Sequence, residues 1–412
     1  MNHRKLFRSP RVATIALIAA GAAAFAVPTV AQAAPKEGRV KVMSRNIYLG
    51  ADLSEAIQAE NSTALAVAAQ GIWNDVHSTL PQKRAKLQAK EIAQAKPDLV
   101  GLQEVAIWRG DYSAPAQDGP VTPATTVEFD YLQSLMDELK KQGAKYKVVR
   151  QQKEFDAEIP LAGGLTADNP GDGRLTMRDV VLMRKDAGVS VKFDFSQRFE
   201  NPLIIEDIGG VEGFNVRVDR GFVAMDANVR GTEFRFVNTH LEAFDNTAKL
   251  AQAEELVQGL PAQIGPANPQ DVDVPVVLVG DLNSDDEIVE TLGDTPGHQA
   301  DELPYAAIVD AGLEERSYDG LNTDGVDELY SCCFNAELIN ESPATALDDI
   351  DHTVDHVMVE DDDHGDGVDP NSNDIELVNS FQTGNDPAEF ARFGRWASDH
   401  LGVVSVLQFP TP

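Results

Sequence analysis

Short apolar runs with polar side chains at one end recur along this chain. The runs are VKVMSRN at residues 40–46, DLVGLQE at 98–104, FRFVNTH at 234–240, VVLVGDLN at 276–283, TVDHVMV at 353–359 and DHLGVVSVL at 399–407. Apolar runs of this length, rich in Val and Leu, are typical of buried β-strands. An ionisable group at the end of a buried strand needs a cation or a hydrogen-bonding partner. The series therefore predicts that the polar ends of several strands form one site.

Segments with helical periodicity lie between these strands. We predict helices over residues 54–76, 81–96, 129–142 and 246–260, the second ended by Pro97 and the third by Gly143. Further strands are expected at 145–150, 179–184, 189–195, 221–229, 232–240, 274–282, 354–359, 375–381 and 402–408, with a hairpin turn at Gly231. Strands that alternate with helices and also form hairpins predict an α/β fold with mixed sheets.

Residues 1–33 have the composition of a secretory signal peptide. Four basic residues precede an apolar, Ala-rich stretch from Val12 to Val27, and Ala31-Gln32-Ala33 fits a small-residue cleavage site. The apolar stretch is short for a membrane span, so an uncleaved N-terminal anchor is the less favoured alternative. We therefore expect a secreted, extracellular protein without a transmembrane segment after the signal peptide is removed.

The remaining residues, 34–412, predict a single domain, because neither a linker nor a repeat interrupts them. Removing residues 1–33 takes away four basic residues and no acidic one, so the formal net charge changes from −33 to −37. A surface this acidic repels polyanions at long range. The charge therefore disfavours long nucleic acid as a partner, but it does not forbid a small phosphoester.

Cys332 and Cys333 are the two cysteines of the chain, and they are neighbours. Export makes their oxidation to a disulfide feasible, but a bridge between neighbours cannot close a long loop. A disulfide and two buried thiols are equal alternatives at this point. Two cysteines without further ligands nearby in the sequence do not complete a zinc site.

Four residues at three of the polar ends carry side chains suited to phosphoryl chemistry. Glu104 and His240 each end an apolar run, and the alternatives are a solvated loop Glu and a structural His. Asp281 and Asn283 follow the run VVLVG, and period-two alternation makes both side chains face the same way. An acid that orients water beside an amide donor suits attack on a phosphoryl group. The alternative for this pair is an Asx-turn.

Three more ionisable residues stand at the start of apolar runs. Asp355 is suited to orient a histidine through a carboxylate–imidazole hydrogen bond, and the alternative is an ordinary Asp at a strand start. Asp399 is a candidate metal ligand, and His400 is the candidate imidazole partner. Carboxylates, amides and two histidines presented in this way predict a divalent-metal phosphoester site.

The motifs SRNIYLG, DLVGLQEV, FVNTHLE, VLVGDLNS, TVDHVMV and SDHLGVV, in this order, resemble the endonuclease/exonuclease/phosphatase superfamily. That group includes pancreatic-type deoxyribonuclease, abasic-site endonucleases, neutral sphingomyelinases and inositol-polyphosphate phosphatases. The resemblance extends from about Gly38 to Phe409 and points to a secreted bacterial branch. It implies a four-layer α/β/β/α sandwich of two packed mixed β-sheets flanked by helices, with the site at one end of the sheets. Residues 34–412 would then form one catalytic domain.

The resemblance also implies a metal and its ligands. Glu104 would be the principal metal ligand, Asp399 would contribute to the metal region, and Asn46 would bind substrate beside the metal. The implied metal is Mg²⁺, with Mn²⁺ and Ca²⁺ as alternatives. Thr353 and Tyr48 depart from the family, which often has an Arg and, in some nucleases, a second acid at these positions.

The remaining implied roles are catalytic. His240 would steady the phosphoryl oxygens or protonate the leaving oxygen. Asp281 would orient or deprotonate the attacking water, and Asn283 would donate to a phosphate oxygen. His400 would bind the phosphate, held in place by Asp355.

Two further segments attract attention. Arg178 lies in RLTMRDVVLM, a stretch that resembles the secreted branch, and it is a candidate phosphate clamp because a planar guanidinium matches phosphate oxygens. The alternative is a salt bridge beside the strand. The segment 360–369 is rich in oxygen ligands but lacks the spacing of a calcium-binding loop, so we interpret it as a solvated acidic loop.

The sequence thus predicts a secreted divalent-metal-dependent phosphoesterase that hydrolyses a phosphodiester or phosphomonoester by metal-assisted attack of water. We expect a monomer that acts on a small molecule or a lipid headgroup. One alternative is a secreted nuclease acting on DNA or RNA, although no basic groove is visible in the sequence. The other is a non-catalytic binding or adhesion protein on the same fold. It is disfavoured because the principal motif positions carry chemically competent side chains.

Overall fold

The computed structural model describes residues 37–112, 123–165, 171–259, 274–285, 298–318, 330–339, 347, 350–360, 375–388 and 393–410. The predicted signal peptide, residues 1–33, lies outside these ranges, and so does the acidic segment after Glu360. Within them, no helix is both long enough and apolar enough to cross a bilayer.

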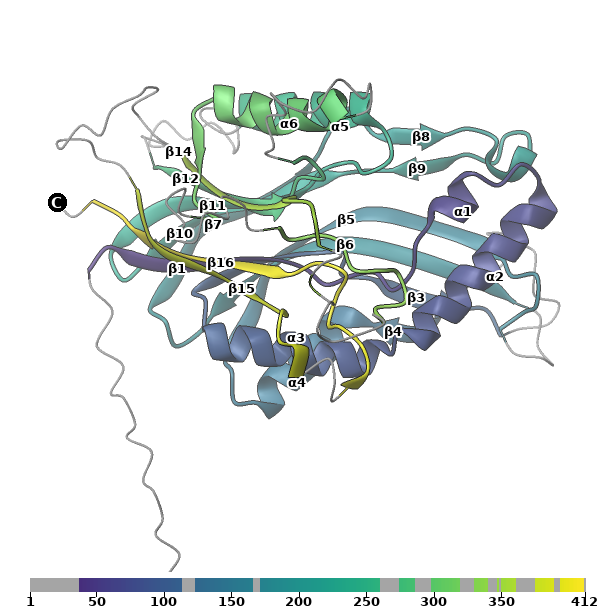
Figure 1. Ribbon diagram of the computed structural model, residues 1–412, viewed down its shortest axis with the longest axis horizontal. Helices are drawn as coiled ribbons and strands as arrows, with labels where there is room; N and C mark the ends of the chain where they lie inside the picture. The colour runs from purple at the N-terminus through teal and green to yellow at the C-terminus, as the bar shows by residue number, and fades with distance from the viewer. Residues whose placement is uncertain are drawn as a thin grey trace, which may run out of the picture. The chain divides into compact units, whose positions relative to one another are not determined.

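Two mixed β-sheets form the centre of the fold (Figure 1). The first has the strand order β15 (Glu376–Thr383), β16 (Gly402–Gln408), β1 (Arg39–Asn46), β2 (Leu99–Gln103), β6 (Asp172–Arg184), β5 (Tyr146–Pro160), β9 (Val216–Val218) and β8 (Leu203–Ile205). Beside this path, β3 (Ile107–Gly110) pairs with β6 and with β4 (Thr126–Asp130). The second sheet has the order β13 (Leu313–Glu315), β14 (Asp355–Glu360), β12 (Val276–Asp281), β11 (Thr232–His240), β10 (Gly221–Val229) and β7 (Val189–Arg198).

Helices cover the outer face of each sheet (Figure 1). The helices are α1 (Ser54–Ile57), α2 (Ser62–Ser78), α3 (Pro81–Ala95), α4 (Tyr131–Lys141), α5 (Asn246–Gly259), α6 (His298–Asp310) and the short 3₁₀ helix η2 (Ile208–Gly210). The first four and η2 lie on the first sheet, and α5 and α6 lie on the second. The expected four-layer α/β/β/α sandwich is therefore confirmed.

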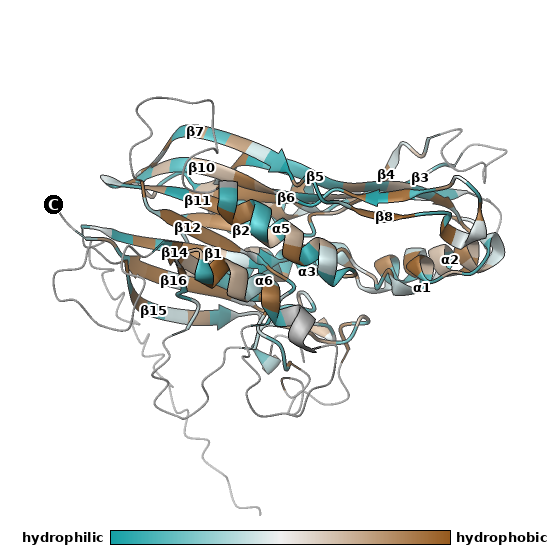
Figure 2. Ribbon diagram, turned by 90° about the horizontal axis from the view of Figure 1, so that it is seen from above, coloured by the Kyte–Doolittle hydropathy of each residue, from teal (hydrophilic) through white to brown (hydrophobic). Residues whose placement is uncertain are grey.

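Three apolar cores separate the four layers. The central core joins the sheets through Val42 of β1, Val181 of β6 and Phe236 of β11. Met43, the next residue along β1, faces the opposite core between the first sheet and its helices, as the period of two requires. Central strands such as β12 and β16 are accordingly coloured mainly as hydrophobic in Figure 2. Burial on both faces explains why these strands read as nearly continuous apolar runs.

The sheets approach closely beneath the predicted site. Gly101 of β2 has no room for a side chain, because an added Cβ would lie 2.4 Å from Oδ1 of Asn238 on β11. That oxygen accepts a hydrogen bond from Nε2 of Gln103 at 2.6 Å, and the Asn238 amide donates to the carbonyl of Leu102 at 3.1 Å. A buried polar bridge therefore fixes the two sheets relative to each other.

The predicted helix over residues 54–76 is wrong, because it is two helices. α1 ends at Ile57 and α2 begins at Ser62, and Asn61 between them caps α2 by accepting a hydrogen bond from the amide of Ala64 at 2.9 Å. The predicted strands 145–150 and 179–184 are also too short. β5 and β6 form a long antiparallel ribbon that continues to the pair Pro160↔Asp172.

Candidate active site

The polar ends of four strands meet at one edge of the two sheets. In the first sheet, β1 and β2 are parallel, so the end of β1 at Asn46 lies beside the end of β2 at Gln103. In the second sheet, His240 at the end of β11 pairs with Asp281 at the end of the parallel strand β12. Asp355 begins β14, which is antiparallel, and it therefore stands opposite Asp281. The local strand directions thus deliver the polar residues to one place.

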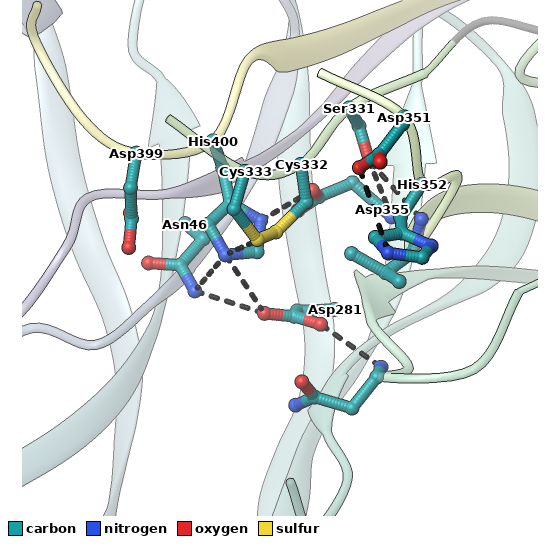
Figure 3. The surroundings of a disulfide bond; sticks show 12 residues. Asn46, Asp281, Ser331, Cys332, Cys333, Asp351, His352, Asp355, Asp399 and His400 are labelled. Carbon is teal, nitrogen blue, oxygen red and sulfur yellow. Dashed lines mark hydrogen bonds and ion pairs between the residues drawn. A yellow bond between two sulfur atoms is a disulfide. The ribbon is translucent and has the colours of Figure 1, made fainter. Parts of the chain in front are cut away.

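Asn46 connects the two sheets at this edge. Its Nδ2 donates to Oδ2 of Asp281 at 2.9 Å and lies 3.5 Å from Nε2 of His400. Its Oδ1 accepts a hydrogen bond from the amide of Tyr48 at 2.9 Å. Figure 3 shows Asn46, Asp281 and His400 pointing toward one another. Since Asn46 is fully buried, its amide is held in one orientation by these contacts.

Left-handed backbone conformations mark the same edge. Tyr48, Glu104 and Asn283 have φ values of 60°, 58° and 47°, and each follows the end of a strand. This conformation costs on the order of 1 kcal/mol or more for a residue other than glycine, and it persists only where surrounding contacts enforce it. For Asn283 the enforcing contacts are its amide, which donates to Oδ1 of Asp281 at 2.9 Å, and its Nδ2, which donates to the carbonyl of Leu241 at 3.1 Å. The Asp281–Asn283 pair therefore makes the contact of an Asx-turn and also lies in the candidate site.

His400 is paired with Asp355. Nδ1 of His400 donates to Oδ2 of Asp355 at 2.7 Å, and the backbone amide of Asp355 donates to Oγ of Ser331 at 3.0 Å. Burial of His400 opposes its protonation, but Asp355, Asp281 and Asp399 outweigh burial and raise its pKa well above the ordinary value. Because Nδ1 faces a carboxylate, Nε2 is the nitrogen that is available to hold and release a proton.

His240 has the opposite electrostatic environment. Nη1 of Arg220 lies 2.9 Å from Nδ1 of His240, and Arg220 also donates from Nε to Glu242 at 3.4 Å. A guanidinium only donates, so Nδ1 of His240 accepts and its Nε2 carries the hydrogen. Burial, together with the charges of Arg220 and His400, lowers the pKa of His240 well below the ordinary value. His240 is therefore a neutral donor, with Nε2 3.5 Å from Oδ2 of Asp281.

Three carboxylates lie close to these histidines. Asp281 is buried, whereas Glu104 and Asp399 are partly exposed to the cavity. Oε2 of Glu104 accepts a hydrogen bond from the amide of Leu49 at 2.6 Å. Burial raises the pKa of all three carboxyls, to about 6 for Asp399, and the charge of Glu104 adds to the effect on Asp399. Such a group of oxygen donors, whose negative charges repel one another, fits a hard divalent cation.

The ligand atoms of Asp281, Asp355 and His400 lie within 4.8 Å of one another. In this group the nitrogen that faces Asp355 is already used by the short hydrogen bond to that carboxylate. We therefore interpret Asp281, Asp355 and His400 as a hydrogen-bonded group that positions protons. Glu104 and Asp399 are the residues that would hold a metal.

Arg178 lies apart from this arrangement. Its Nη2 donates to Oδ1 of Asp130 at 2.8 Å and its Nε to the carbonyl of Val105 at 3.0 Å. Arg178 thus forms the salt bridge that was the alternative to a phosphate clamp. The arginine that lines the cavity is Arg220, which the sequence analysis did not single out. The signal in the sequence is weak, because Arg220 is simply the residue before the strand that begins at Gly221.

Cys332 and Cys333 are joined by a disulfide beside His400 (Figure 3). Sγ of Cys332 lies 3.6 Å from Nε2 of His400, while Cys333 is exposed and lines the cavity. The backbone amide of Cys332 also donates to the carbonyl of His352 at 3.0 Å. The disulfide is therefore part of the wall of the site.

A cavity of about 460 Å³ opens at this edge of the sheets. Its polar lining consists largely of residues already described, among them Glu104, His240, Asp281, Asn283, Asp399 and His400. A volume in this range accommodates a small-molecule ligand. The cavity therefore offers space for a phosphoester directly against the two histidines.

No protein-family model and no curated protein matches this sequence. Among solved structures, the chain is similar to an endonuclease/exonuclease/phosphatase family protein from Bacteroides thetaiotaomicron, at 17% identity and a TM-score of 0.48, covering 90% of this chain and 95% of that one. It is similar to a mannosyl-6-phosphatase from Bacteroides thetaiotaomicron VPI-5482, at 17% identity and a TM-score of 0.47, covering 90% and 100%. A third similar structure is an endonuclease/exonuclease/phosphatase from Beutenbergia cavernae DSM 12333, at 17% identity and a TM-score of 0.48, covering 90% and 72%. Two of these structures carry the name of the superfamily that the motifs resemble, and the similarity is one of fold. The secreted branch stays a prediction.

Proposed function

We propose that the protein is a secreted, divalent-metal-dependent phosphoesterase that hydrolyses a phosphodiester or phosphomonoester with water. The observation that carries the proposal is the pair of oppositely polarised histidines on either side of Asp281. His240 is held neutral by Arg220, and His400 is held ready for protonation by Asp355. Neighbouring groups whose pKa values are driven apart are typical of acid–base sites.

Asp281 is the residue that would orient the attacking water. Its Oδ2 accepts from Asn46 at 2.9 Å and lies 3.5 Å from Nε2 of His240 and 3.8 Å from Nε2 of His400. Burial raises its pKa, which makes the carboxylate a stronger base. Water held by this oxygen would stand at the centre of the site, between donors suited to phosphoryl oxygens.

Two donors would then stabilise the charge that develops on the phosphoryl group. The neutral His240 offers Nε2–H, and the Asn46 amide is fixed by its contacts with both sheets. Fixed donors of this kind need no reorganisation during the reaction, which is the basis of their effect on rate. His400, with its raised pKa, is the group suited to give a proton to the leaving oxygen.

Glu104 and Asp399 would hold the metal, and Mg²⁺ is preferred over Mn²⁺ and Ca²⁺ because it combines carboxylate oxygens with substrate phosphate. A bound divalent ion supplies Lewis acidity and charge neutralisation at the phosphoryl oxygen. The raised pKa of Asp399, about 6, means that cation uptake releases a proton from this carboxyl at or below about pH 6, where the carboxyl is at least half protonated.

The nuclease alternative is disfavoured by charge. After loss of residues 1–33 the chain carries 30 basic and 67 acidic residues, a formal net charge of −37. Non-specific nucleic-acid binding depends on basic contacts along the phosphate backbone. The arginine at the cavity, Arg220, is committed to His240 and Glu242. The proposed secretion rests on the composition of residues 1–33.

The test is hydrolysis by purified protein reconstituted with Mg²⁺, measured against a phosphomonoester, a phosphodiester, sphingomyelin and duplex DNA. We expect a phosphoester other than DNA to be cleaved, and we expect chelation to abolish turnover. His240→Ala should lose most of this turnover, and His77→Ala is its matched control, since His77 lies on α2 and pairs with Glu128. Absence of hydrolysis with every substrate and metal would favour the non-catalytic alternative.

A further inference from the structure

The cavity at the proposed active site continues between two groups of apolar side chains. Helix α2 contributes Ile72 and Trp73, and Leu53 is the residue before α1. β5 and β6 contribute Phe155, Ile159, Leu175 and Met177, and η2 and β9 contribute Ile208 and Val216. We call these nine residues the apolar chamber. Figure 1 shows α2, β5, β6 and β9 side by side at one end of the sandwich.

The indole N–H of Trp108, beside the chamber, already has a partner. Nε1 of Trp108, which also lines the cavity, donates to the carbonyl of Leu49 at 2.8 Å, so that its ring and not its N–H is available to a ligand. The rings of Trp73 and Trp108 meet edge to face at 6.4 Å. A hydroxyl-rich group placed against the nine apolar side chains of the chamber would lose water there and would not gain a hydrogen bond from the Trp108 N–H, which is unfavourable.

A hydrocarbon group, in contrast, gains from the chamber. Each methylene that leaves water improves binding about fourfold. Phe244, which lines the same cavity, is 46% exposed, so an apolar residue stands at the rim as well. The cavity thus combines charge-bearing groups from the strand ends with an apolar extension, and a ligand that fills both parts must be amphiphilic.

We propose that the substrate is an amphiphilic phosphoester whose phosphoryl group lies against His240 and His400 and whose hydrocarbon group occupies the apolar chamber. This inference rests on the proposed function and specifies its substrate class. In the reaction, water gives up a proton to Asp281 as its oxygen forms a bond to phosphorus, the ester bond to the leaving oxygen breaks, and that oxygen takes up a proton from His400. The same chemistry is found in membrane phospholipids and in free single-chain phosphoesters.

The experiment compares methyl, butyl and octyl p-nitrophenyl phosphate, used as soluble monomers with the Mg²⁺-loaded protein. We expect kcat/KM to rise with chain length and to differ at least tenfold between the methyl and octyl esters. Equal kcat/KM across the series would overturn the proposal while leaving the phosphoesterase function intact. Cleavage of none of the three would count against phosphodiester hydrolysis, because all three are diesters, and the binding measurement then decides separately on the chamber.

The binding arm needs no turnover. Octyl phosphate and methyl phosphate are titrated into the protein while the fluorescence of tryptophan is followed, since Trp73 and Trp108 line the cavity. We expect octyl phosphate to bind at least tenfold more tightly than methyl phosphate. Equal affinities for octyl and methyl phosphate contradict the assignment of the chamber, independently of whether any substrate is hydrolysed. Vesicles of phosphatidylcholine are tested alongside. Hydrolysis of the vesicle lipid indicates a membrane phospholipid as substrate, whereas cleavage of the soluble octyl ester alone indicates a free single-chain phosphoester.

A variant tests the chamber itself. Ala157 on β5 lines the cavity and is partly exposed, so Ala157→Phe places a ring in the chamber. We expect the ratio of octyl to methyl kcat/KM to fall at least fivefold. Val67→Phe is the matched control, because Val67 is on α2 but is 57% exposed, and it should keep the wild-type ratio. If Ala157→Phe does not fold, the smaller Ala157→Leu replaces it, and an unchanged ratio in a folded variant overturns the proposal.

Discussion

His400 donates a hydrogen bond from Nδ1 to Asp355 across 2.7 Å, although Asp355 belongs to the second sheet and His400 leads into a strand of the first. Asp355 begins β14 of the second sheet, and His400 stands just before β16 of the first. The contact therefore exists only when the sandwich is closed at this edge. It fixes the ring so that Nε2 faces Asn46 and Asp281, 3.5 Å and 3.8 Å away.

Asp355→Asn removes the charge that holds this pair. We expect the pKa of His400 to fall, because Asp355 is the strongest of the influences that raise it. Turnover should fall about 10²-fold, the scale typical of a general acid or base. The pKa is measured by NMR titration of the histidine side chains in metal-free protein, with the resonance of His77 as the internal reference. A pKa of His400 that does not move would show that the hydrogen bond does not control its protonation.

The two histidines should act on one transition state. We expect His240→Ala and His400→Ala each to lower kcat by about 10²-fold or more. The double variant should lose much less than the product of the two factors, because groups that act as a unit are not additive. Steady-state kinetics of the four proteins measures the coupling. Wild-type turnover in either single variant would make that histidine structural.

Glu104→Gln tests the metal assignment. The amide keeps the shape of the side chain but loses the anionic oxygen, so we expect Mg²⁺ binding by calorimetry, and activity with it, to weaken strongly. The metal-free variant should be as stable to heat as the wild type, since burial already raises the pKa of Glu104 and the charge is unfavourable there. Glu128→Gln, a change away from the cavity, is the control. Unchanged magnesium dependence in a folded Glu104→Gln protein would contradict the assignment.

Binding to DNA should be weak and should depend little on salt. A net charge of −37 leaves few cations to replace counterions along a phosphate backbone, and the slope of log K against log salt reports how many are replaced. Fluorescence anisotropy with a labelled duplex between 50 and 200 mM salt, a range of about fourfold, measures the slope. Efficient Mg²⁺-dependent DNA cleavage that declines steeply with salt would instead support the nuclease.

Glu315 gives a pH-dependent contribution to stability away from the cavity. It accepts hydrogen bonds from Nδ1 of His356 at 2.6 Å and the amide of Ser317 at 2.7 Å. Burial opposes ionisation, but His356 and these hydrogen bonds outweigh it and lower the pKa of Glu315 below 4.5. A lowered carboxyl pKa stabilises the fold above the unfolded-state value, and this contribution disappears as pH falls through the folded-state value.

Glu315→Gln should therefore lower the free energy of unfolding by about 1–3 kcal/mol at pH 7. The difference from wild type should shrink as pH falls below about 4.5. Urea unfolding at several pH values provides the measurement. Glu314→Gln is the control, because Glu314 is 45% exposed and its ion pair with Arg316 lies at the surface. A difference that is constant with pH would point to packing and not to charge.

Much of the fold could be predicted because the buried strands are local patterns. The hairpin at Gly231 is an example, since Gly231 has a φ of 99° and the flanking residues Val229 and Thr232 pair as expected. The break between α1 and α2 escaped prediction because apolar periodicity continues across it, and only the Asn61 cap marks the boundary. The full length of the ribbon of β5 and β6 escaped prediction because residues 151–160 of β5, QQKEFDAEIP, contain no continuous apolar run.

The candidate site, like the fold, could be predicted only in part. His240, Asp281 and Asp355 stand at strand ends in the sequence, and the structure places them side by side. The contact of Arg220 with His240 depends on the pairing of β10 with β11, which joins residues twenty positions apart. The partner of Arg178, Asp130, lies 48 residues away. Such pairings are set by tertiary structure, so no local pattern distinguishes the arginine in the cavity from the one outside it.

The pairing of the first strand with the last has a consequence for synthesis. β1 and β16 are neighbours from Arg39↔Gln408 to Ser44↔Val403, and Asn46 meets His400 across 354 positions of sequence. Translation proceeds from the N-terminus, so β1 cannot pair with β16 until residues 402–408 have been synthesised. The nascent polypeptide therefore has no assembled site. The candidate site is therefore complete only after residues 399–408 have been synthesised and β16 has paired with β1.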